Sequence, residues 1–245
     1  AQFPVLTLRT GSIGFLIVTL FALTLWLFKK YIKAISITAL ILIIALTWIQ
    51  RWPAGDWQIA NCDIGQGDSM VINLGNHRGL VIDVGPDAVA EDRCLKALGI
   101  KEIPLLILSH FHADHVGGIS SVIKNREIGQ VWISNLPKPE QTYKQVISEL
   151  SKFKVRTVEQ GDKFVFKSNQ VEIRVLWPSR QVQEFESLPG DGSAINNSSI
   201  SLIIKSRDFS LFTAGDIEPE VQELITNSGF LSAVDILKIN HHGSR

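Results

Sequence analysis

The chain has 245 residues, and its 24 lysines and arginines balance its 24 aspartates and glutamates, so the formal net charge is zero. A neutral chain produces no strong overall field, so composition gives no sign of nucleic-acid binding; a local basic patch or a metal would have to hold an anionic substrate. The hydrophobic fraction of 45% is ordinary for a globular protein, but the first fifty residues carry the excess.

Two uncharged apolar runs dominate those first fifty residues, one from Gly11 to Phe28 and one from Ala34 to Ile49. As helices they would extend roughly 24–27 Å each, slightly less than the ~30 Å hydrocarbon core of a bilayer. The residues between them, 29–33, are too few for anything but a tight loop. We therefore expect residues 1–55 to form a transmembrane helical hairpin, in preference to a buried soluble hairpin or a cleaved signal peptide. Because the chain starts with Ala1, we expect a fragment of a larger, multi-pass protein of the cell membrane.

Basic residues predict the orientation of this hairpin. The loop carries three lysines, whereas each outer flank carries one arginine, Arg9 or Arg51. By the positive-inside tendency the loop faces the cytoplasm, and everything after Arg51 is extracytoplasmic. In that compartment Cys62 and Cys94 could form a disulfide; the alternative is two small buried apolar residues.

Residues 56–245 predict a separate globular domain. Short apolar segments broken by glycine and aspartate predict strands at 57–65, 69–75, 79–85, 103–110, 130–134, 154–159, 163–167, 171–178, 200–206, 209–216 and 234–244. Helix-like segments fall at 92–99, 119–125, 143–152 and 218–229, and residues 181–197 predict a loop. Runs of strands with helices between them favour a mixed α/β or α+β domain of two sheets covered by helices.

Five of the six histidines fall in two tight clusters. In the segment SHFHADHVGG, His110 ends an apolar strand, and His112 points to the same side because side chains two residues apart share a face. Asp114 and His115 then open the next helix. Four side chains of ligand type therefore converge within six residues, and the two glycines that follow allow the backbone to approach a partner closely.

Two later apolar strands end in residues of the same kind, in Asp216 and in the pair His241-His242. If these strands share a sheet and a direction, their ends meet at one edge, where a metal could collect all the ligands. Imidazole and carboxylate suit zinc, manganese or iron, and the lack of nearby cysteine argues against a structural cysteine–zinc site. The alternative is that the histidines are surface groups and that Asp114 and Asp216 cap helices.

The segment HFHADH, with Asp83 in LVIDVG before it and Asp216 in TAGD after it, resembles the motifs of the metallo-β-lactamase superfamily across residues 57–245. Within that superfamily, the chain resembles the extracytoplasmic domain of the ComEC family, the channel proteins of bacterial DNA uptake in natural competence. The resembling segments are DIGQGDS at 63–69, the metal run at 110–115, NNSSISL at 196–202, AGDIEPE at 214–220 and LKINHHGS at 237–244. The resemblance implies an αββα sandwich. Because such domains usually continue past the last motif, it also implies that this one is truncated at its C-terminus.

The superfamily pattern implies one or two divalent metal ions, Mn²⁺ or Zn²⁺. Carried over residue by residue, it makes His110 and His112 ligands of a first ion, Asp114 and His115 ligands of a second, and Asp216 the bridge between the two. Asp114 and Asp216 would also serve catalysis, because Asp114 lies beside the attacking water and Asp216 holds both ions.

The last histidines and the motifs around them complete the implied site. Of His241 and His242, we favour His242 as the ligand because a small residue follows it. Asp83 would orient the site from behind the ligands, and Asp68 of DIGQGDS would touch the site or the substrate, or else belong to a structural turn.

The chain departs from the superfamily at the third motif. Where most members have a histidine, this chain has Asn196-Asn197, with Asn197 as the candidate ligand and Asn196 beside it. An amide oxygen is a weaker ligand than imidazole, so the first ion would be held loosely or be absent from the isolated protein, and a harder ion such as Mn²⁺ would suit the site better than Zn²⁺.

The resemblance implies a membrane-anchored nuclease that hydrolyses one strand of DNA during uptake, using hydroxide generated on the metal. Its partners would be single-stranded or duplex DNA, the membrane and the DNA-uptake machinery. Two alternatives remain open: a hydrolase of another ester, such as a choline-phosphate ester, lactone or thioester, and a catalytically silent domain that supports a transport channel.

Overall fold

The computed structural model describes residues 12–49, 57–168, 170–179 and 193–243. The chain divides into two compact units, Ala1–Ala54 and Gly55–Arg245. In its described part the first unit is one helix, α1, and the second unit holds all the described strands.

The expected hairpin is wrong, because α1 runs without a break from Ser12 to Ile49. Residues 29–33 contain neither glycine nor proline, and lysine, tyrosine and isoleucine all adopt helical geometry, so nothing there interrupts the backbone hydrogen bonds. The segment Gly14–Leu46 is long and apolar enough to cross a membrane, and its most apolar window has no buried residue. The described chain thus has one candidate span, and the lysine loop on which the predicted orientation rested does not exist.

The second unit contains two mixed sheets. The first has the strand order β1-β2-β3-β4-β5-β6, antiparallel from β1 to β3 and parallel from β3 to β6. Its strands are β1 Ile59–Asn61, β2 Met70–Asn73, β3 Arg78–Ile82, β4 Glu102–Leu108, β5 Glu127–Ile133 and β6 Lys154–Thr157. The second has the order β11-β10-β9-β8-β7, antiparallel except for the pair β10 and β11. Its strands are β7 Lys163–Phe166, β8 Val171–Trp177, β9 Ser201–Lys205, β10 Ser210–Thr213 and β11 Ile236–Leu237.

Alternation along the strands separates the interior into three layers of apolar side chains. One set lies between the sheets and includes Leu105 and Ile107 of β4 and Leu202 and Ile204 of β9. The residues that alternate with them in the first sheet pack against the helices α2 Ala88–Ala97, α4 Ile119–Asn125 and α5 Glu140–Glu149. The outer face of the second sheet packs against α7 Pro219–Asn227.

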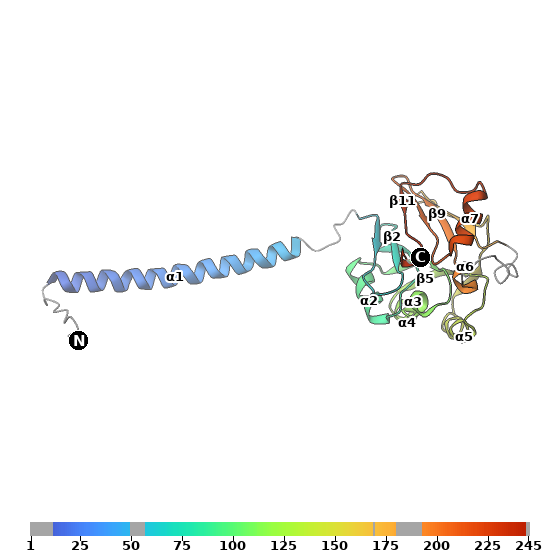
Figure 1. The fold of residues 1–245 in the computed structure, drawn as a ribbon. Helices are drawn as coiled ribbons and strands as arrows, with labels where there is room; N and C mark the ends of the chain where they lie inside the picture. Colours follow the sequence, from blue (N-terminus) through green and yellow to red (C-terminus); the bar gives the residue numbers. More distant parts are fainter. Residues whose placement is uncertain (1–11, 50–56, 169, 180–192, 244–245) are drawn as a thin grey trace, which may run out of the picture. The chain divides into compact units, whose positions relative to one another are not determined.

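Figure 1 shows α2, α4 and α5 gathered beside the first sheet and α7 beside the second. The predicted αββα arrangement is therefore confirmed, with helices outside and two sheets inside. Two short helices, α3 Ala113–Val116 and α6 Ala194–Asn197, and a 3₁₀ turn at His241–Gly243 lie at the ends of strands. Most of the predicted loop 181–197 lies outside the described residues, and its last part forms α6.

Cys62 and Cys94 form a disulfide, with their Cα atoms 5.7 Å apart. The bond joins the segment that follows β1 to α2, across the packing between the first sheet and its helices. Of the two alternatives for these cysteines, a disulfide or two small buried apolar residues, the structure contains the disulfide.

Candidate metal centre

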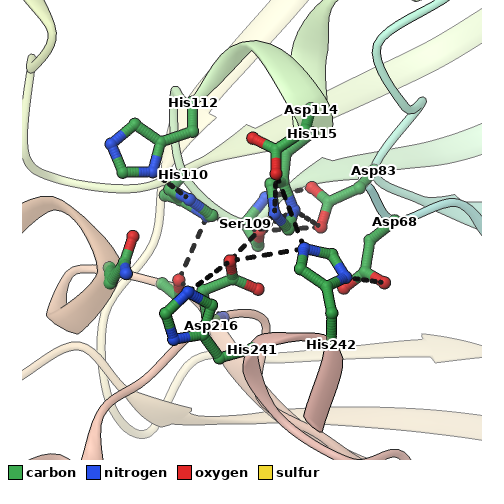
Figure 2. A network of polar contacts seen from close by, with 12 residues as sticks. Asp68, Asp83, Ser109, His110, His112, Asp114, His115, Asp216, His241 and His242 are labelled. Carbon is green, nitrogen blue, oxygen red and sulfur yellow. Dashed lines mark hydrogen bonds and ion pairs between the residues drawn. The ribbon is translucent and has the colours of Figure 1, made fainter. Parts of the chain in front are cut away.

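The predicted run of metal ligands, residues 110–115 (the ligand run), lies at the end of β4. His110 and His115 are fully buried, His112 precedes α3 as its N-cap residue, and Asp114 sits in the first helical turn. His110 Nε2 and His112 Nδ1 face each other at 3.0 Å, as expected for residues two apart at the end of a strand. Figure 2 shows Asp114 and His115 beside His242, and His112 to one side next to His110.

Two glycines after the run allow α3 and α4 to pack closely against the segment that follows β3. A Cβ on Gly117 would lie 2.4 Å from the carbonyl oxygen of Pro86, and one on Gly118 would lie 2.1 Å from that of Val84. Val84 N donates a hydrogen bond to His115 O, so the segment after β3 and the ligand run are fastened backbone to backbone. The close approach predicted from the glycine pair is present, and its partner is the segment that carries Asp83.

Asp83 lies beside His115 and contacts its imidazole. Its Oδ2 lies 2.9 Å from His115 Nδ1, and Ser109 donates to it twice, from its backbone N to Oδ1 and from its hydroxyl to Oδ2, both at 2.7 Å. A carboxylate on one imidazole nitrogen fixes the tautomer and aims the other nitrogen. His115 Nε2 consequently faces the centre of the site, 3.2 Å from Asp216 Oδ2.

The pKa values reflect this burial of opposite charges. Burial disfavours the charged form of His115, but Asp83 and the contacts with Asp216 outweigh it and raise the pKa of His115 to about 10. Burial also opposes ionisation of Asp216, yet the contacts with His115 hold the pKa of Asp216 below its usual value. Burial lowers the pKa of His110 and of His112, which keeps these two imidazoles in the neutral form that binds metals.

Asp216 reaches the site from the second sheet. It follows β10, is 2% exposed, and its backbone N donates to Ser199 Oγ at 3.1 Å. Ser199 Oγ also lies 3.1 Å from His110 Nδ1, so one hydroxyl contacts both groups. The strands β4 and β10 belong to different sheets, contrary to the condition that we placed on them, but the residues that follow them, His110 and Asp216, are linked through Ser199.

The two histidines of the last cluster have different neighbours. His242 Nε2 lies 3.5 Å from Asp114 Oδ2 and 3.6 Å from Asp216 Oδ2. His241 Nε2 lies 4.0 Å from Asp216 Oδ2, while its Nδ1 lies 3.3 Å from Glu218 Oε1. His242 is thus nearer than His241 to the carboxylates of Asp114 and Asp216. The strand expected at 234–244 shortens to β11, and both histidines follow it in the 3₁₀ turn.

Asp68 of the DIGQGDS segment also lies in the site. Its Oδ1 is 3.4 Å from His242 Nδ1, and its Oδ2 pairs with Lys238 Nζ. The backbone explains this position, because Asp68 N donates to Asp114 O and Asp68 O accepts from Gly85 N. Gly67, at φ +135°, would place a Cβ 2.3 Å from Asp114 O, so the motif's glycine allows its backbone to touch the ligand run.

Four of these groups could hold a cation together. The ligand atoms of Asp68, His115, Asp216 and His242 all lie within 4.8 Å of one another. Two buried atoms that face this space, His115 Nε2 and Asp216 Oδ1, make no hydrogen bond with the described residues. Buried polar atoms rarely stay unpaired, so the donor set fits a divalent ion with mixed imidazole and carboxylate ligands.

The two asparagines occupy different environments. Asn197 is fully buried, accepts a hydrogen bond from Glu218 N at 2.9 Å and donates one to Glu220 Oε1 at 2.7 Å, so both ends of its amide are engaged with the start of α7. Asn196 donates to Glu218 Oε1 at 2.9 Å, contacts His112, and leaves its buried Oδ1 without a hydrogen bond among the described residues. Asn197 is thus held at both ends of its amide by residues at the start of α7, whereas Asn196 is held there through its nitrogen only.

Sequence reasoning missed four residues that the site uses: Ser109, Ser199, Glu218 and Lys238. Serines and glutamates are too frequent on surfaces for their types to signal such roles. Lys238 alone carried a usable signal, since it stands four residues before His242 in an otherwise uncharged segment.

The family model described as the metallo-beta-lactamase superfamily matches residues 62–190. The chain is 27% identical over 253 residues to ComE operon protein 3 of Bacillus subtilis (strain 168), covering 93% of this chain and 31% of that protein. It is 24% identical over 195 residues to Recombination protein 2 of Haemophilus influenzae, covering 77% of this chain and 22% of that protein. The chain therefore spans less than a third of either relative. Among solved structures, a subclass B3 metallo-beta-lactamase isolated from a soil metagenome library has 18% identity, covers 76% of each chain and gives a TM-score of 0.49.

Proposed function

The chain belongs to the metallo-beta-lactamase superfamily, whose model matches more than half of it, and on that premise we propose that it is a membrane-anchored, metal-dependent phosphodiesterase that cuts one strand of DNA during uptake. The observation that carries the proposal is the group Asp68, His115, Asp216 and His242, whose ligand atoms lie within 4.8 Å of one another beside the His110–His112 pair. Such a group of carboxylates and imidazoles is costly to assemble unless a cation compensates it.

Two half-sites would hold the ions. His110, His112 and Asn196 would form one, and Asp114, His115 and His242 would form the other, with Asp216 available to both and Asp68 beside the second. Divalent ions bound there would activate water and neutralise the charge that develops on a phosphate. The oxygen atoms of Asp68, Asp114 and Asn196 favour Mn²⁺, whereas the imidazoles can bind either Mn²⁺ or Zn²⁺.

The side chains divide the remaining work. Asp83 holds His115 by its Nδ1, so that Nε2 stays aimed at the centre. Asp114 is the most exposed carboxylate of the group, with 34% of its side chain accessible, so it can hold the attacking water at the open side. Ser199 ties His110 to the backbone of Asp216 and thereby fixes the spacing between the half-sites.

DNA as the substrate is supported by the relatives and by the ComEC-like segments. One relative is named for the ComE operon and the other for recombination. An extracytoplasmic position for the domain is supported by the Cys62–Cys94 disulfide, because such bonds persist in oxidising compartments. Membrane attachment is supported by α1. The DNA-uptake machinery would then be the partner that presents the strand.

The test is cleavage of end-labelled single- and double-stranded DNA by the full chain in detergent, with Mn²⁺, Zn²⁺ or EDTA. The double variant His112→Ala, Asp114→Ala removes one ligand from each half-site. His77→Ala is the matched control, because His77 lies away from the site and contacts Gly99 O. We expect metal-dependent cleavage that the double variant loses and the control keeps. A folded, metal-loaded chain that cleaves neither DNA would exclude the nuclease and favour another ester substrate or a channel-supporting role.

A further inference from the structure

Lys238 and Asp68 form an ion pair at the rim of the metal centre, although they stand 170 residues apart in the chain. Their side chains are 14% and 13% exposed, so a ligand that enters the site can reach the pair. The other oxygen of Asp68 lies 3.4 Å from His242 Nδ1. The carboxylate of Asp68 therefore lies between the ammonium group of Lys238 and His242, an implied metal ligand.

The charge of the surroundings makes this lysine distinctive. Within the described residues the network contains the carboxylates of Asp68, Asp83, Asp114, Asp216 and Glu218. Over residues 57–168, 170–179 and 193–243, Lys238 is the one lysine or arginine that pairs with a member of this network. A phosphodiester carries a negative charge, so this fixed cation opposes the repulsion that the carboxylates would exert on it.

The donors of the ammonium group suit an anionic ligand. A lysine has three N–H donors, and Asp68 takes one of them; in the described part of the chain Nζ makes no second hydrogen bond. The same short segment carries Lys238 just after β11 and His242 in the turn, so the cation and the metal ligand are placed together. Lys238 N also donates to Phe212 O at 3.0 Å, which anchors the lysine's backbone to β10.

Resting on the proposed function, we propose that Lys238 binds a non-bridging phosphate oxygen of the substrate and that Asp68 positions it. The site thereby selects anionic phosphodiesters over neutral esters of similar size. The pair Asp68–Lys238 gives the DIGQGDS segment a role at the substrate side of the metal centre, in addition to its packing against Asp114.

The experiment compares two chromogenic esters on the metal-loaded full chain: bis(4-nitrophenyl) phosphate, which is anionic, and 4-nitrophenyl acetate, which is neutral. We expect Lys238→Met to lower kcat/KM for the phosphodiester about tenfold or more, because a charge-assisted hydrogen bond is lost, and to change the acetate rate less than about twofold. Lys238→Arg keeps the charge and should retain most of the phosphodiester activity. Lys205→Met, on an exposed lysine at the far end of β9, is the matched control. An equal loss on both esters, or no loss on either, would overturn the proposal.

A second experiment separates this proposal from the proposed function. It measures the affinity for inorganic phosphate by titration calorimetry on the same metal-loaded variants. We expect about tenfold weaker phosphate binding in Lys238→Met at unchanged metal content. If that loss occurs in a chain that cleaves no DNA, Lys238 is the anion ligand and the nuclease proposal fails. If DNA is cleaved and phosphate binding is unaffected by Lys238→Met, the nuclease stands and the role of Lys238 is refuted.

Discussion

Glu91 in α2 is a carboxyl group with 0% exposure, close to Ser69 at the end of the DIGQGDS segment. Burial raises its pKa to about 7, against the opposing effects of Ser69 and Arg126. The folded chain thus favours the neutral form more than the unfolded chain does. The resulting stability is present below pH about 4.5 and is lost as the pH rises through about 7.

We therefore predict that Glu91→Gln is more stable than the parent chain at pH 8 and close to it at pH 5. A shift of this size corresponds to roughly 3 kcal/mol, as an order of magnitude. Thermal unfolding of both chains in EDTA at the two pH values would measure it. Glu140→Gln, on an exposed glutamate, is the control. A stability difference that does not change with pH would contradict the assignment.

The two adjacent asparagines allow a sharper test of the first half-site. Asn196→His should supply the imidazole that most superfamily members have, and should raise the affinity for the first ion, measured as bound metal per chain after dialysis against limiting Zn²⁺. Asn197→His should instead destabilise the fold by about 1–3 kcal/mol, because it leaves the partners of a fully buried amide unpaired. The reverse pattern would show that Asn197 faces the metal.

At the scale of single residues, the sequence predicted most of the site from the types and spacing of its groups. His110, His112, Asp114 and His115 converge because a strand end and a helix start impose known side-chain directions. The choice between Asn196 and Asn197 could not be made in this way, because the amino-acid sequence does not show which of the two adjacent side chains faces the site. It depends on where α7 begins, and hence on which amide that helix's first residues engage.

At the scale of elements, the DIGQGDS turn is held against the ligand run by one glycine. A Cβ on Gly67 would overlap Asp114 O, and the residue's φ of +135° is rarely adopted by other amino acids. We predict that Gly67→Ala displaces Asp68 from the site and weakens metal binding. Gly161→Ala is the matched control for the loss of a positive-φ glycine, because a Cβ there would meet no atom within 4 Å. Metal titration by calorimetry on both variants measures the effect, and equal affinities would refute it.

Elements also show where sequence reasoning failed. The strands were predictable because apolar alternation and glycine punctuation coincide in them. The continuity of α1 was not predicted, because a break was inferred from the length of a bilayer and from three lysines, neither of which ends a helix. Only a glycine, a proline or an alternative set of hydrogen bonds would have done so.

At the scale of the whole molecule, the candidate metal centre takes its residues from both sheets of the second unit. Without a metal, the carboxylates of Asp68, Asp114 and Asp216 have only the neighbouring imidazoles and Lys238 to offset their mutual repulsion. We predict that EDTA lowers the Tm of the parent chain, since an ion at 100 times its Kd contributes about 2.7 kcal/mol of stability. The effect should shrink as the pH falls, because an imidazole ligand must be deprotonated to bind the ion, and deprotonation becomes less favourable at lower pH. The variant His112→Ala, Asp114→Ala should show a smaller shift, and an equal shift by differential scanning calorimetry would place the metal elsewhere.

The separation of Asp68 from Lys238 and His242 along the chain has a consequence for biosynthesis. A ribosome that has released residues 57–168 has made the ligand run and its Asp83 support, but neither Asp216 nor His242. The nascent domain therefore cannot assemble the second half-site until its last strand has been translated. A truncated translation product would carry the histidine motif and yet lack Asp216 and His242, so its candidate metal centre would be incomplete.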